Sequence, residues 1–485
     1  MIVERVPPPG DVGSAFAGLF GESRWACWLD SARAEPGLAR FSYLGSPGAD
    51  GEVLTYAVGQ GQVVVTAGGR EHREDGTILE ALRRRLAPAT ERARSCPRSG
   101  HERPQSPGGG EGLPFELVDG WVGYLGYELK GDLGSTNRHV SQHPDAVWMR
   151  CDRLLVIDHA TGAAWLVAHG PGAAAWLAWA RETLRINAAR PPRPHHPPRP
   201  GWPHTPPDGS RRAATLLVRS VEQYRQDVEA CLDALRRGES YEICLTDTVL
   251  AESHDDPFDI YLRLRRLNPA PHAAYLRLGD RHVLSASPEL FLRVTRDGEV
   301  STKPIKGTAR RHTDPTHDAR AAADLAADAK TRAENLMIAD LLRNDLSRVC
   351  DPATIHVPRL MHVESYATVH QLVTTVRGRL AEGRTAIDAV EACFPGGSMT
   401  GAPKHRTMQI IDELETRARG IYSGALGFVD RSGAVDLSVV IRTAVMHHGQ
   451  VEIGAGGAIV LDSDPQAETD EMLLKAAAVL PALRP

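Results

Sequence analysis

Residues 283–308, VLSASPELFLRVTRDGEVSTKPIKGT, predict an antiparallel hairpin and so favour a fold built on antiparallel sheet. Two strand-like runs, 283–295 and 299–305, flank Asp297-Gly298, a dipeptide that is a strong signal for a tight two-residue turn. The segment therefore predicts antiparallel sheet near the middle of the chain.

The same hairpin predicts a pairing between two chemically useful side chains. If the turn closes tightly, Arg296 pairs with Glu299, and Glu289 then faces Lys306. Directly opposed side chains in a ladder have Cβ atoms about 4.5–5.5 Å apart, so a carboxyl and an amine would face one site. An ordinary cross-strand ion pair is the alternative on the hairpin alone, and a slip of register would remove the pairing.

Outside the hairpin, helices and strands mix without the strict alternation of a parallel-sheet protein. Residues 224–235 repeat apolar side chains at helical spacing after a capping signal at Ser220 and Gln223, and Gly238 ends the helix. Residues 241–250 then have the pattern of a strand. This mixture predicts an α+β fold built on antiparallel sheet.

Two segments of biased composition divide the chain. Residues 191–207, PPRPHHPPRPGWPHTPP, are a proline-rich stretch without helix or strand spacing, and residues 94–113 have the composition of a loop. We therefore predict an N-terminal subdomain over 1–190, a linker over 191–212 and a catalytic region over 213–485.

Composition excludes several classes of function. The 485 residues are 42% hydrophobic and 24% charged, which is ordinary for a soluble globular protein. A net charge of −5 gives no electrostatic footprint for nucleic acid. No run of about 18 apolar residues predicts a membrane helix, and the N-terminus lacks a signal-peptide pattern. Seven scattered cysteines without a CxxC pair fit a reducing cytoplasm.

Lysine is rare in this chain, which makes each lysine informative. Of the 56 basic residues, six are lysine. A GC-rich genome is the simple cause of the bias, but the surviving lysines are candidates for work that arginine cannot do, such as nucleophilic attack. They are Lys130, Lys303, Lys306, Lys330, Lys404 and Lys475.

Two helical segments carry carboxylates in positions that suit a metal ion. In the run 330–346, Glu334 falls on the apolar face, where a carboxylate must be paired, protonated or bound to a metal. Near the C-terminus, Glu468, Glu471 and Lys475 share one helix face, which suits magnesium at the acids and an anion at the lysine. A salt bridge at the rim of the first helix and a solvated charged face on the second are the alternatives.

Small residues mark two places where a ligand can approach the backbone. Residues 396–404, GGSMTGAPK, form a loop that runs into a helix starting near Pro403, and free amides at helix N-termini bind anions. A predicted strand also allows a ligand close to its backbone, because it has no side chain at Gly454, Gly456 and Gly457. A structural turn is the alternative for the loop.

His370 and Arg442 lie in strand-like runs, at 368–372 and 440–443. Taken singly, each residue is more typical of a satisfied core or edge position than of a ligand contact.

Taken in order, these motifs resemble the chorismate-binding enzymes. That family includes component I of anthranilate synthase, component I of aminodeoxychorismate synthase, and the isochorismate and salicylate synthases. The resemblance covers most of the chain and implies one large α+β unit, two antiparallel sheets packed face to face with outer helices and chorismate between them. It rests on RFSYLG at 40–45, GWVGYLGYE at 120–128, GESYEICLT at 238–246, SPELF at 287–291, PIKGTARR at 304–311, RAENLMIADLLRNDLSRV at 332–349, FPGGSMTGAPK at 394–404 and DSDPQAETDEMLLK at 462–475.

The resemblance implies a role for each motif residue. Glu334 and Glu471 would hold magnesium, which holds a chorismate carboxylate, and Glu468 would be the third acid near the metal. Glu289 would protonate the leaving hydroxyl. The expected substrate contacts are Gly307, Thr308, His370 beside the ring, Thr400, Tyr422, Arg442, Lys475 and the backbone amides of Gly456 and Gly457.

Lys306 is the position that separates members of this family. The resemblance implies that members with lysine in this motif replace the C4 hydroxyl of chorismate by an amine, whereas anthranilate synthases carry alanine there. Lys306 would attack C2 as the C4 hydroxyl leaves, and ammonia would then enter at C4 and expel the lysine. An amine nucleophile must be partly deprotonated, so we expect the pKa of Lys306 to be depressed near the metal and Lys303.

A second position supports the same assignment. The isochorismate and salicylate synthases have a water-activating lysine where this chain has Glu242, so the resemblance disfavours attack by water. Glu242 also departs from the glutamine of many amination-type relatives, and Ala458 stands where several have glycine. Both departures concern the placement of the substrate.

The resemblance also implies partners and rivals. Ammonia would come from a separate glutamine amidotransferase, and a separate lyase would convert the product to 4-aminobenzoate. Anthranilate synthase component I is the nearest alternative. A catalytically silent, tryptophan-binding regulatory subunit is the alternative from another class, with Leu29-Asp30-Ser31 near the expected edge of the tryptophan pocket. We expect no nucleic-acid or membrane partner.

Overall fold

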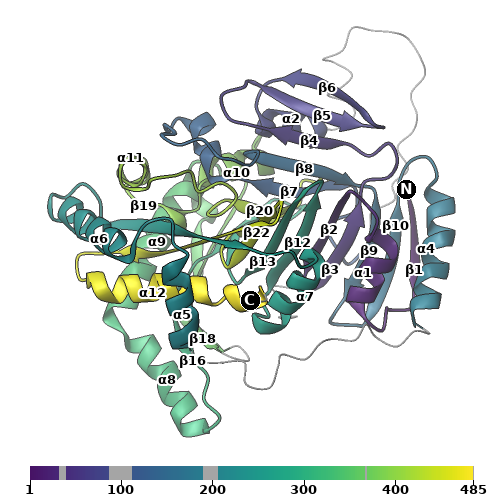
Figure 1. Ribbon diagram of the computed structural model, residues 1–485. Helices are drawn as coiled ribbons and strands as arrows, with labels where there is room; N and C mark the ends of the chain where they lie inside the picture. The colour runs from purple at the N-terminus through teal and green to yellow at the C-terminus, as the bar shows by residue number, and fades with distance from the viewer. Residues whose placement is uncertain (32–39, 87–111, 189–205, 366–368, 484–485) are drawn as a thin grey trace.

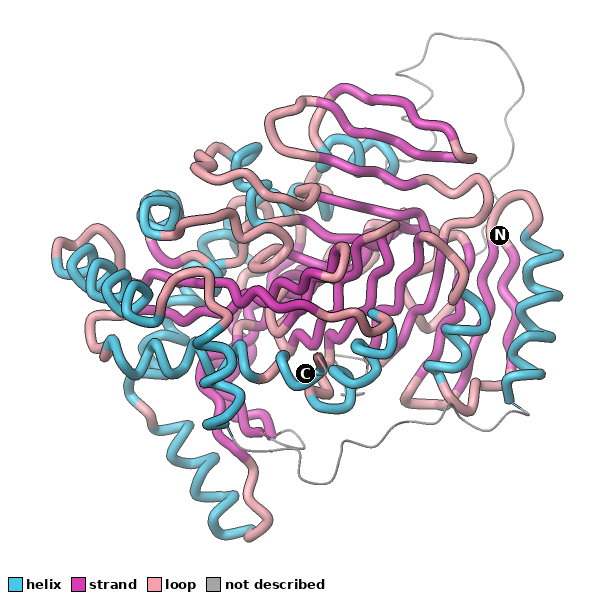
Figure 2. The backbone as a smooth tube through the Cα atoms, viewed as in Figure 1, coloured by secondary structure: helices cyan, strands magenta, loops and turns pink. Residues whose placement is uncertain are grey.

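Two large antiparallel sheets with helices on their outer faces make up the molecule (Figure 1; Figure 2). The computed structural model describes residues 1–31, 40–86, 112–188, 206–365 and 369–483. The predicted α+β class is confirmed. The predicted loop 94–113 and the linker up to residue 205 lie outside the described residues, apart from Gly112 and Leu113.

Within the described residues, the first sheet has eleven strands. In sheet order they are β1 (Ile2–Val6), β10 (Ala163–Ala168), β9 (Arg153–Asp158), β3 (Phe41–Ser46), β2 (Trp25–Asp30), β12 (His272–Leu278), β13 (Arg281–Ser287), β22 (Thr443–His447), β23 (Gln450–Ile459), β11 (Glu242–Glu252) and β19 (Gly401–Ala402).

The second sheet has twelve strands in the part of the chain that the structure describes, where β17 (His356–Ser365) pairs with β18 alone. The others, in sheet order, are β16 (Ile305–Arg310), β18 (Val369–Arg379), β15 (Glu299–Lys303), β14 (Leu290–Val294), β21 (Val435–Val439), β20 (Ala425–Asp430), β7 (Gly120–Leu125), β8 (Ala146–Cys151), β4 (Val53–Tyr56), β5 (Gln62–Ala67) and β6 (Arg70–Asp75). Both sheets therefore combine strands from before and after the proline-rich segment.

Helices cover the outer faces of both sheets, and α8 projects away from the body (Figure 1). The α-helices are α1 (Val12–Phe20), α2 (Ile78–Leu86), α4 (Ala173–Ala188), α5 (Pro206–Thr215), α6 (Val221–Arg236), α7 (Pro257–Leu267), α8 (Pro315–Ala327), α9 (Ala329–Ser347), α10 (Ala386–Cys393), α11 (Lys404–Leu414) and α12 (Pro465–Ala477). Short 3-10 helices are η1 (Tyr127–Leu133), η2 (Pro352–Thr354), η3 (Gly397–Met399) and η4 (Leu480–Ala482). None of the described helices is long and apolar enough to cross a membrane.

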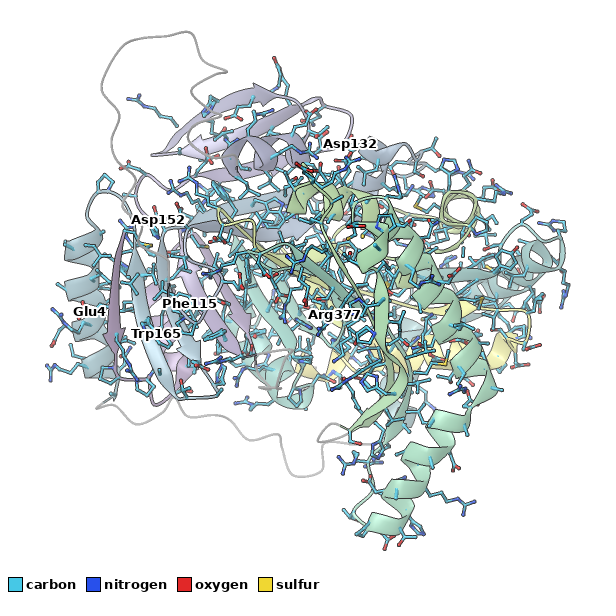
Figure 3. All side chains as sticks on the ribbon, turned by 180° about the vertical axis from the view of Figure 1, so that it is seen from behind. Glu4, Phe115, Asp132, Asp152, Trp165 and Arg377 are labelled. Carbon is cyan, nitrogen blue, oxygen red and sulfur yellow. The ribbon has the colours of Figure 1, made fainter. Side chains whose placement is uncertain are left out.

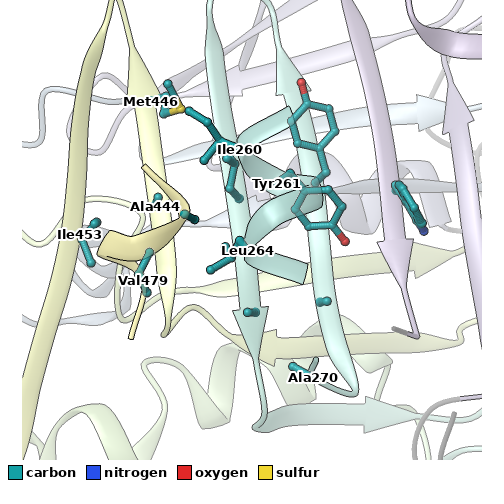
Figure 4. Close-up of a cluster of buried hydrophobic side chains, with 14 of the residues drawn as sticks. Ile260, Tyr261, Leu264, Ala270, Ala444, Met446, Ile453 and Val479 are labelled. Carbon is teal, nitrogen blue, oxygen red and sulfur yellow. The ribbon is translucent and has the colours of Figure 1, made fainter. Parts of the chain in front are cut away.

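Alternation along the strands divides the core into layers. Leu154 and Val156 of β9 face the apolar layer between the sheets, whereas Leu155 and Ile157 face the layer under the helices. Successive side chains of a strand point to opposite faces, so a strand buried on both faces is apolar throughout. Figure 4 shows part of the helix-side layer, where Ile260 of α7 lies among strand residues.

The layer between the sheets extends to the far side of the molecule. There Phe115 lies beside Trp165 of β10, with ring centroids 5.3 Å apart (Figure 3). Aromatic pairs at this separation stabilise a core beyond the area that they bury.

The end of the predicted linker is helical. Residues 191–207 were expected to lack helix and strand structure, but α5 begins at Pro206. Proline is tolerated in the first turn of a helix, and Ala213 is fully buried against the main core. Packing onto the neighbouring helix α12 therefore orders this segment. The proposed boundaries at 190 and 213 stay a prediction.

Candidate active site

The polar centre of the molecule forms where the chain passes from one sheet to the other. Glu289 lies between β13 of the first sheet and β14 of the second, and Arg442 lies between β21 and β22. The two crossings run side by side, because Val439 N donates to Glu289 O over 3.0 Å and Ala286 N donates to Arg442 O over 3.1 Å.

Arg442 was expected within a strand-like run, and that prediction is wrong. Its φ of 53° is left-handed, which breaks the extended backbone where the chain turns between the sheets. Its guanidinium makes no hydrogen bond or ion pair with any residue that the structure describes. The half-buried cation is therefore available to an anionic ligand.

Lys306 joins the two sheets through an ion pair. It lies on β16, at the edge of the second sheet, and its Nζ donates over 2.7 Å to Oε1 of Glu242 on β11 of the first sheet. The lysine side chain is 10% exposed and that of Glu242 is 1% exposed. The other carboxylate oxygen of Glu242, Oε2, is buried without a hydrogen bond.

The predicted ladder pairing of Glu289 with Lys306 is wrong. Thr295 N bonds Glu299 O and Gly298 N bonds Thr295 O, so three residues close the turn instead of two. Gly298 has a φ of 83°, as the last residue of a three-residue hairpin loop requires. Leu290 then pairs with Lys303, and Lys306 pairs with Leu372 of β18.

The expected depression of the Lys306 pKa is also wrong for this structure. Burial alone would lower the pKa of the ammonium, but the charges of Glu242 and Glu334 outweigh burial and raise it above its ordinary value. Burial raises the pKa of Glu289 to about 7, although the charge of Lys306 opposes that shift. The site thus holds a charged amine and a carboxyl that is poised to exchange a proton near neutral pH.

Two of the three acids predicted to hold a metal, Glu334 and Glu468, meet at Lys330 between α9 and α12, and Glu471 lies on the same helix as Glu468. Lys330 Nζ lies 2.8 Å from Glu468 Oε1 and 3.9 Å from Glu334 Oε1. Glu471 pairs instead with Lys475 over 2.8 Å. Burial raises the pKa of Glu334 to about 7, because a buried carboxylate without enough positive charge is costly.

These acids fit a hard cation. Glu334 and Glu468 offer carboxylate oxygens from two helices around a point that already holds the ammonium of Lys330, and magnesium prefers a few such oxygens together with waters or ligand oxygens. A Cβ on Gly457 would lie 3.1 Å from Oε2 of Glu468, so the glycine makes room for that carboxylate.

The remaining predicted contacts surround the same region. Lys475 Nζ donates to Gly456 O over 2.9 Å. The ring of Tyr422 lies over Gly454, where a Cβ would come within 2.2 Å of it. The Thr400 hydroxyl is fully buried and donates to backbone oxygens of its own loop.

The two residues after Lys306 lie differently. Gly307 has a φ of 79° and forms a bulge in the pairing of β16 with β18. Thr308 follows as an exposed residue, and the structure shows no contact between it and the buried ion pair.

His370 has partners that the sequence did not reveal. Its Nδ1 lies 2.8 Å from Ser365 Oγ, and its Nε2 lies 3.0 Å from Asp318 Oδ1 on α8. Arg311 holds the other oxygen of Asp318 over 2.8 Å. Both ring nitrogens are therefore engaged, so this arrangement positions the ring and leaves neither nitrogen for a substrate proton.

A buried ion pair behind the site was also missed. Arg419 donates to both oxygens of Glu415, over 2.8 and 2.7 Å, and to the backbone oxygens of Met399 and Cys244. Glu415 in turn accepts from Thr246. The Arg419–Glu415 pair therefore holds the loop that contains Thr400 against strand β11.

Each lysine of the chain lies in an ion pair, a contact that arginine can also make, so the pairs alone do not explain why lysine stands at these positions. Outside the pairs already described, Lys130 pairs with Asp412, Lys303 with Glu364 and Lys404 with Asp345, over 2.8, 2.8 and 2.6 Å. Lys330 was noticed as rare but was not assigned to the acids that it joins.

A cavity of about 400 Å³ lies elsewhere between the sheets. It is lined in part by Leu29, Asp30 and Ser31, at the predicted pocket edge, and by Tyr43 and Phe428. None of the predicted catalytic or metal-binding residues lines it.

Comparison with known proteins gives a consistent result. A family model described as chorismate binding enzyme matches residues 40–481. An aminodeoxychorismate synthase of Streptomyces pristinaespiralis is 48% identical over 99% of this chain and 65% of its own length. Anthranilate synthase component 1 of Streptomyces coelicolor is 37% identical over 97% of this chain and 86% of its own length. The crystal structure of anthranilate synthase component I from Streptococcus pneumoniae is 28% identical, with a TM-score of 0.70 over 92% of this chain and 93% of that one.

The curated relatives named aminodeoxychorismate synthase are longer than the region they share with this chain. The chain spans 65% and 64% of two Streptomyces relatives and 54% and 51% of two plant relatives.

Proposed function

The chain belongs to the chorismate-binding enzyme family, and from that premise we propose that it converts chorismate and ammonia to 4-amino-4-deoxychorismate. The observation that carries the proposal is Lys306, a buried primary amine between the two sheets with the carboxylate of Glu242 beside it. Replacing a hydroxyl by an amine at the same carbon is helped by a covalent step, and a lysine amine can supply one.

Binding of the substrate rests on cations and on the acids of α9 and α12. Arg442 is a half-buried cation without a partner among the described residues, and it is placed to hold one carboxylate of chorismate. Magnesium held by Glu334, Glu471 and Glu468 would supply charge for the other carboxylate. Lys330, which pairs with Glu468 and Glu334, would shift as the ion enters.

The proposed covalent step begins with loss of a proton from Lys306. Glu242 Oε1 lies 2.7 Å from Nζ and is placed to accept that proton. Nζ then bonds to C2, the two conjugated ring double bonds shift to C1=C6 and C4=C5, and the C4–O bond breaks. Glu289, whose pKa is raised to about 7, protonates the leaving hydroxyl, which departs as water.

The second step reverses the electron flow. Ammonia bonds to C4, the two double bonds shift back to C5=C6 and C1=C2, the C2–Nζ bond breaks, and the lysine amine leaves with the proton that the new amine gives up. Ser365 and Asp318 hold the imidazole of His370 in a fixed position beside the substrate ring.

A glutamine amidotransferase is the proposed source of ammonia. The proposed location is the cytoplasm, which we infer from cysteine usage.

The rival within the family is anthranilate synthase component I, which a 37% identical relative represents. Lys306, where the resemblance implies alanine for that enzyme, favours amination at C4. A silent regulatory subunit is disfavoured because the buried Lys306–Glu242 pair and the acids of α9 and α12 are costly to maintain without a ligand.

Incubation with chorismate, magnesium and ammonium tests the proposal. We expect 4-amino-4-deoxychorismate as the main product by chromatography and mass spectrometry, and loss of product when a chelator removes magnesium. Heat-inactivated protein is the control for uncatalysed decay of chorismate. Anthranilate or isochorismate as the main product would contradict the assignment.

We also propose tryptophan as the occupant of the 400 Å³ cavity, because its apolar walls and the neighbouring Asp30 and Ser31 suit an aromatic amino acid. L-Tryptophan is expected to raise the melting temperature in a saturable manner, whereas D-tryptophan is the matched control. An unchanged melting temperature at millimolar L-tryptophan, or an equal response to both enantiomers, counts against the proposal.

A further inference from the structure

Two hairpin turns meet at one end of the first sheet, away from the site described above. Strands β13 and β22 are neighbours, with Arg281 paired to His447. Asp280 lies in the turn between β12 and β13, and His448 lies in the turn between β22 and β23. Pairing of the strands therefore brings Asp280, His447 and His448 together; we call these three residues the turn cluster.

The backbone of the second turn places both imidazoles on the same side. His448 and Gly449 have φ values of 50° and 81°, the left-handed pair of a two-residue hairpin turn. Asparagine is the usual first residue of such a turn, and histidine is also enriched in the left-handed conformation. The result is that the rings of His447 and His448 lie with centroids 4.0 Å apart.

Distances within the turn cluster match those around a metal ion. Oδ2 of Asp280 lies 3.2 Å from Nε2 of His447 and 3.3 Å from Nε2 of His448. All three ligand atoms lie within 4.8 Å of one another. Tetrahedral ligands at about 2.0–2.1 Å from zinc are themselves about 3.3 Å apart. Arg281 binds the other oxygen of Asp280 over 3.0 Å, which leaves Oδ2 facing the two rings.

A further imidazole lies directly behind the turn cluster. His143 is 7% exposed, and neither of its ring nitrogens makes a hydrogen bond. Its ring meets that of His447 edge-on, with centroids 6.1 Å apart. Its Nε2 lies 3.6 Å from Glu452, which is held by Arg417. Among the described residues this buried imidazole has only the long contact with Glu452, so it is able to act as a donor to an ion close by.

We propose that the turn cluster binds a divalent transition-metal ion of the zinc class, with His143 as a further donor close by. Imidazole nitrogens suit zinc, nickel and copper, whereas magnesium prefers oxygen ligands. The turn cluster thus differs in chemistry from the carboxylates of α9 and α12. The ion would tie two hairpins together, and this role does not depend on the proposed function.

Zinc titration of the full chain tests the proposal. The protein is freed of metal with a chelator, exchanged into excess magnesium to occupy the carboxylates, and titrated with zinc chloride in a calorimeter. We expect one zinc ion per chain to bind at the turn cluster. Loss of a residue that merely supports a ligand costs about 10–100-fold in affinity, so the double variant His447→Ala/His448→Ala is expected to lose at least about tenfold.

The chain offers a matched control. His195 and His196 are another adjacent histidine pair, so His195→Ala/His196→Ala removes the same side chains elsewhere. It is expected to bind zinc at the turn cluster as the unaltered protein does. Asp280→Asn, a nearly isosteric change at an exposed turn, should weaken binding like the histidine variant and guards against misfolding. Equal zinc affinity in the unaltered protein and both turn-cluster variants overturns the proposal.

Discussion

The variant Lys306→Ala is expected to lose formation of 4-amino-4-deoxychorismate by on the order of a thousandfold or more. Removing a residue that forms the covalent bond usually costs at least that much in kcat. The loss should be in kcat with little change in KM, because Arg442 and the acids of α9 and α12 remain to bind chorismate. Single-turnover assays with product analysis by mass spectrometry measure it.

Glu242→Gln is the matched companion to that variant. Glutamine keeps the size and shape of the Glu242 side chain beside Lys306 but removes its negative charge and the proposed proton acceptor. Loss of the Glu242 charge removes one of the causes that raise the Lys306 pKa, so the amine should become easier to deprotonate. We expect Glu242→Gln to keep measurable C4 amination.

Normal amination by Lys306→Ala would rule out the covalent step and leave Lys306 as a charge that only positions the substrate.

The variant Arg419→Met is expected to destabilise the protein by about 3–5 kcal/mol. Arg419 is 2% exposed and Glu415 is 6% exposed, so removing the guanidinium leaves a buried carboxylate without its cation. The backbone oxygens of Met399 and Cys244 would lose their donors as well. Denaturant unfolding followed by circular dichroism measures the change.

Arg406→Met is the control for that variant. Arg406 also pairs with a glutamate, Glu239, but its side chain is 39% exposed. Exposed pairs contribute between zero and about 1 kcal/mol, so this variant should unfold almost as the unaltered protein does. Equal destabilisation by both variants would show that the Arg419–Glu415 pair has no special weight in the fold.

Much of the fold could be predicted because local signals agreed with tertiary structure. Residues 224–235 lie within α6, and the Glu334 run lies within α9. The hairpin at Asp297-Gly298 exists, but its register could not be predicted, since two-residue and three-residue loops both place glycine near the turn. One extra loop residue changes every cross-strand pair.

Motif order predicted the members of the candidate site, Lys306, Glu289 and the acids, and their roles stay a prediction. The contacts of these residues could not be predicted, because the ion pair between Lys306 and Glu242 joins strands of different sheets. Periodicity along one strand carries no information about such a neighbour. Asp318 and Ser365 were missed for the same reason, because they reach His370 from α8 and the end of β17.

The interleaving of the two sheets has a consequence for synthesis on the ribosome. In the first sheet, β2 pairs with β12, and in the second, β7 pairs with β20. When residues 1–190 have left the ribosome, β2 and β7 still lack these partners. The partner strands begin more than 80 residues further along the chain, so both sheets keep unpaired edges until then. Helix α12, which carries Glu468 and Glu471, leaves the ribosome later than all of these strands. The candidate site therefore cannot assemble until α12 has been synthesised, because two of its predicted acids lie on that helix.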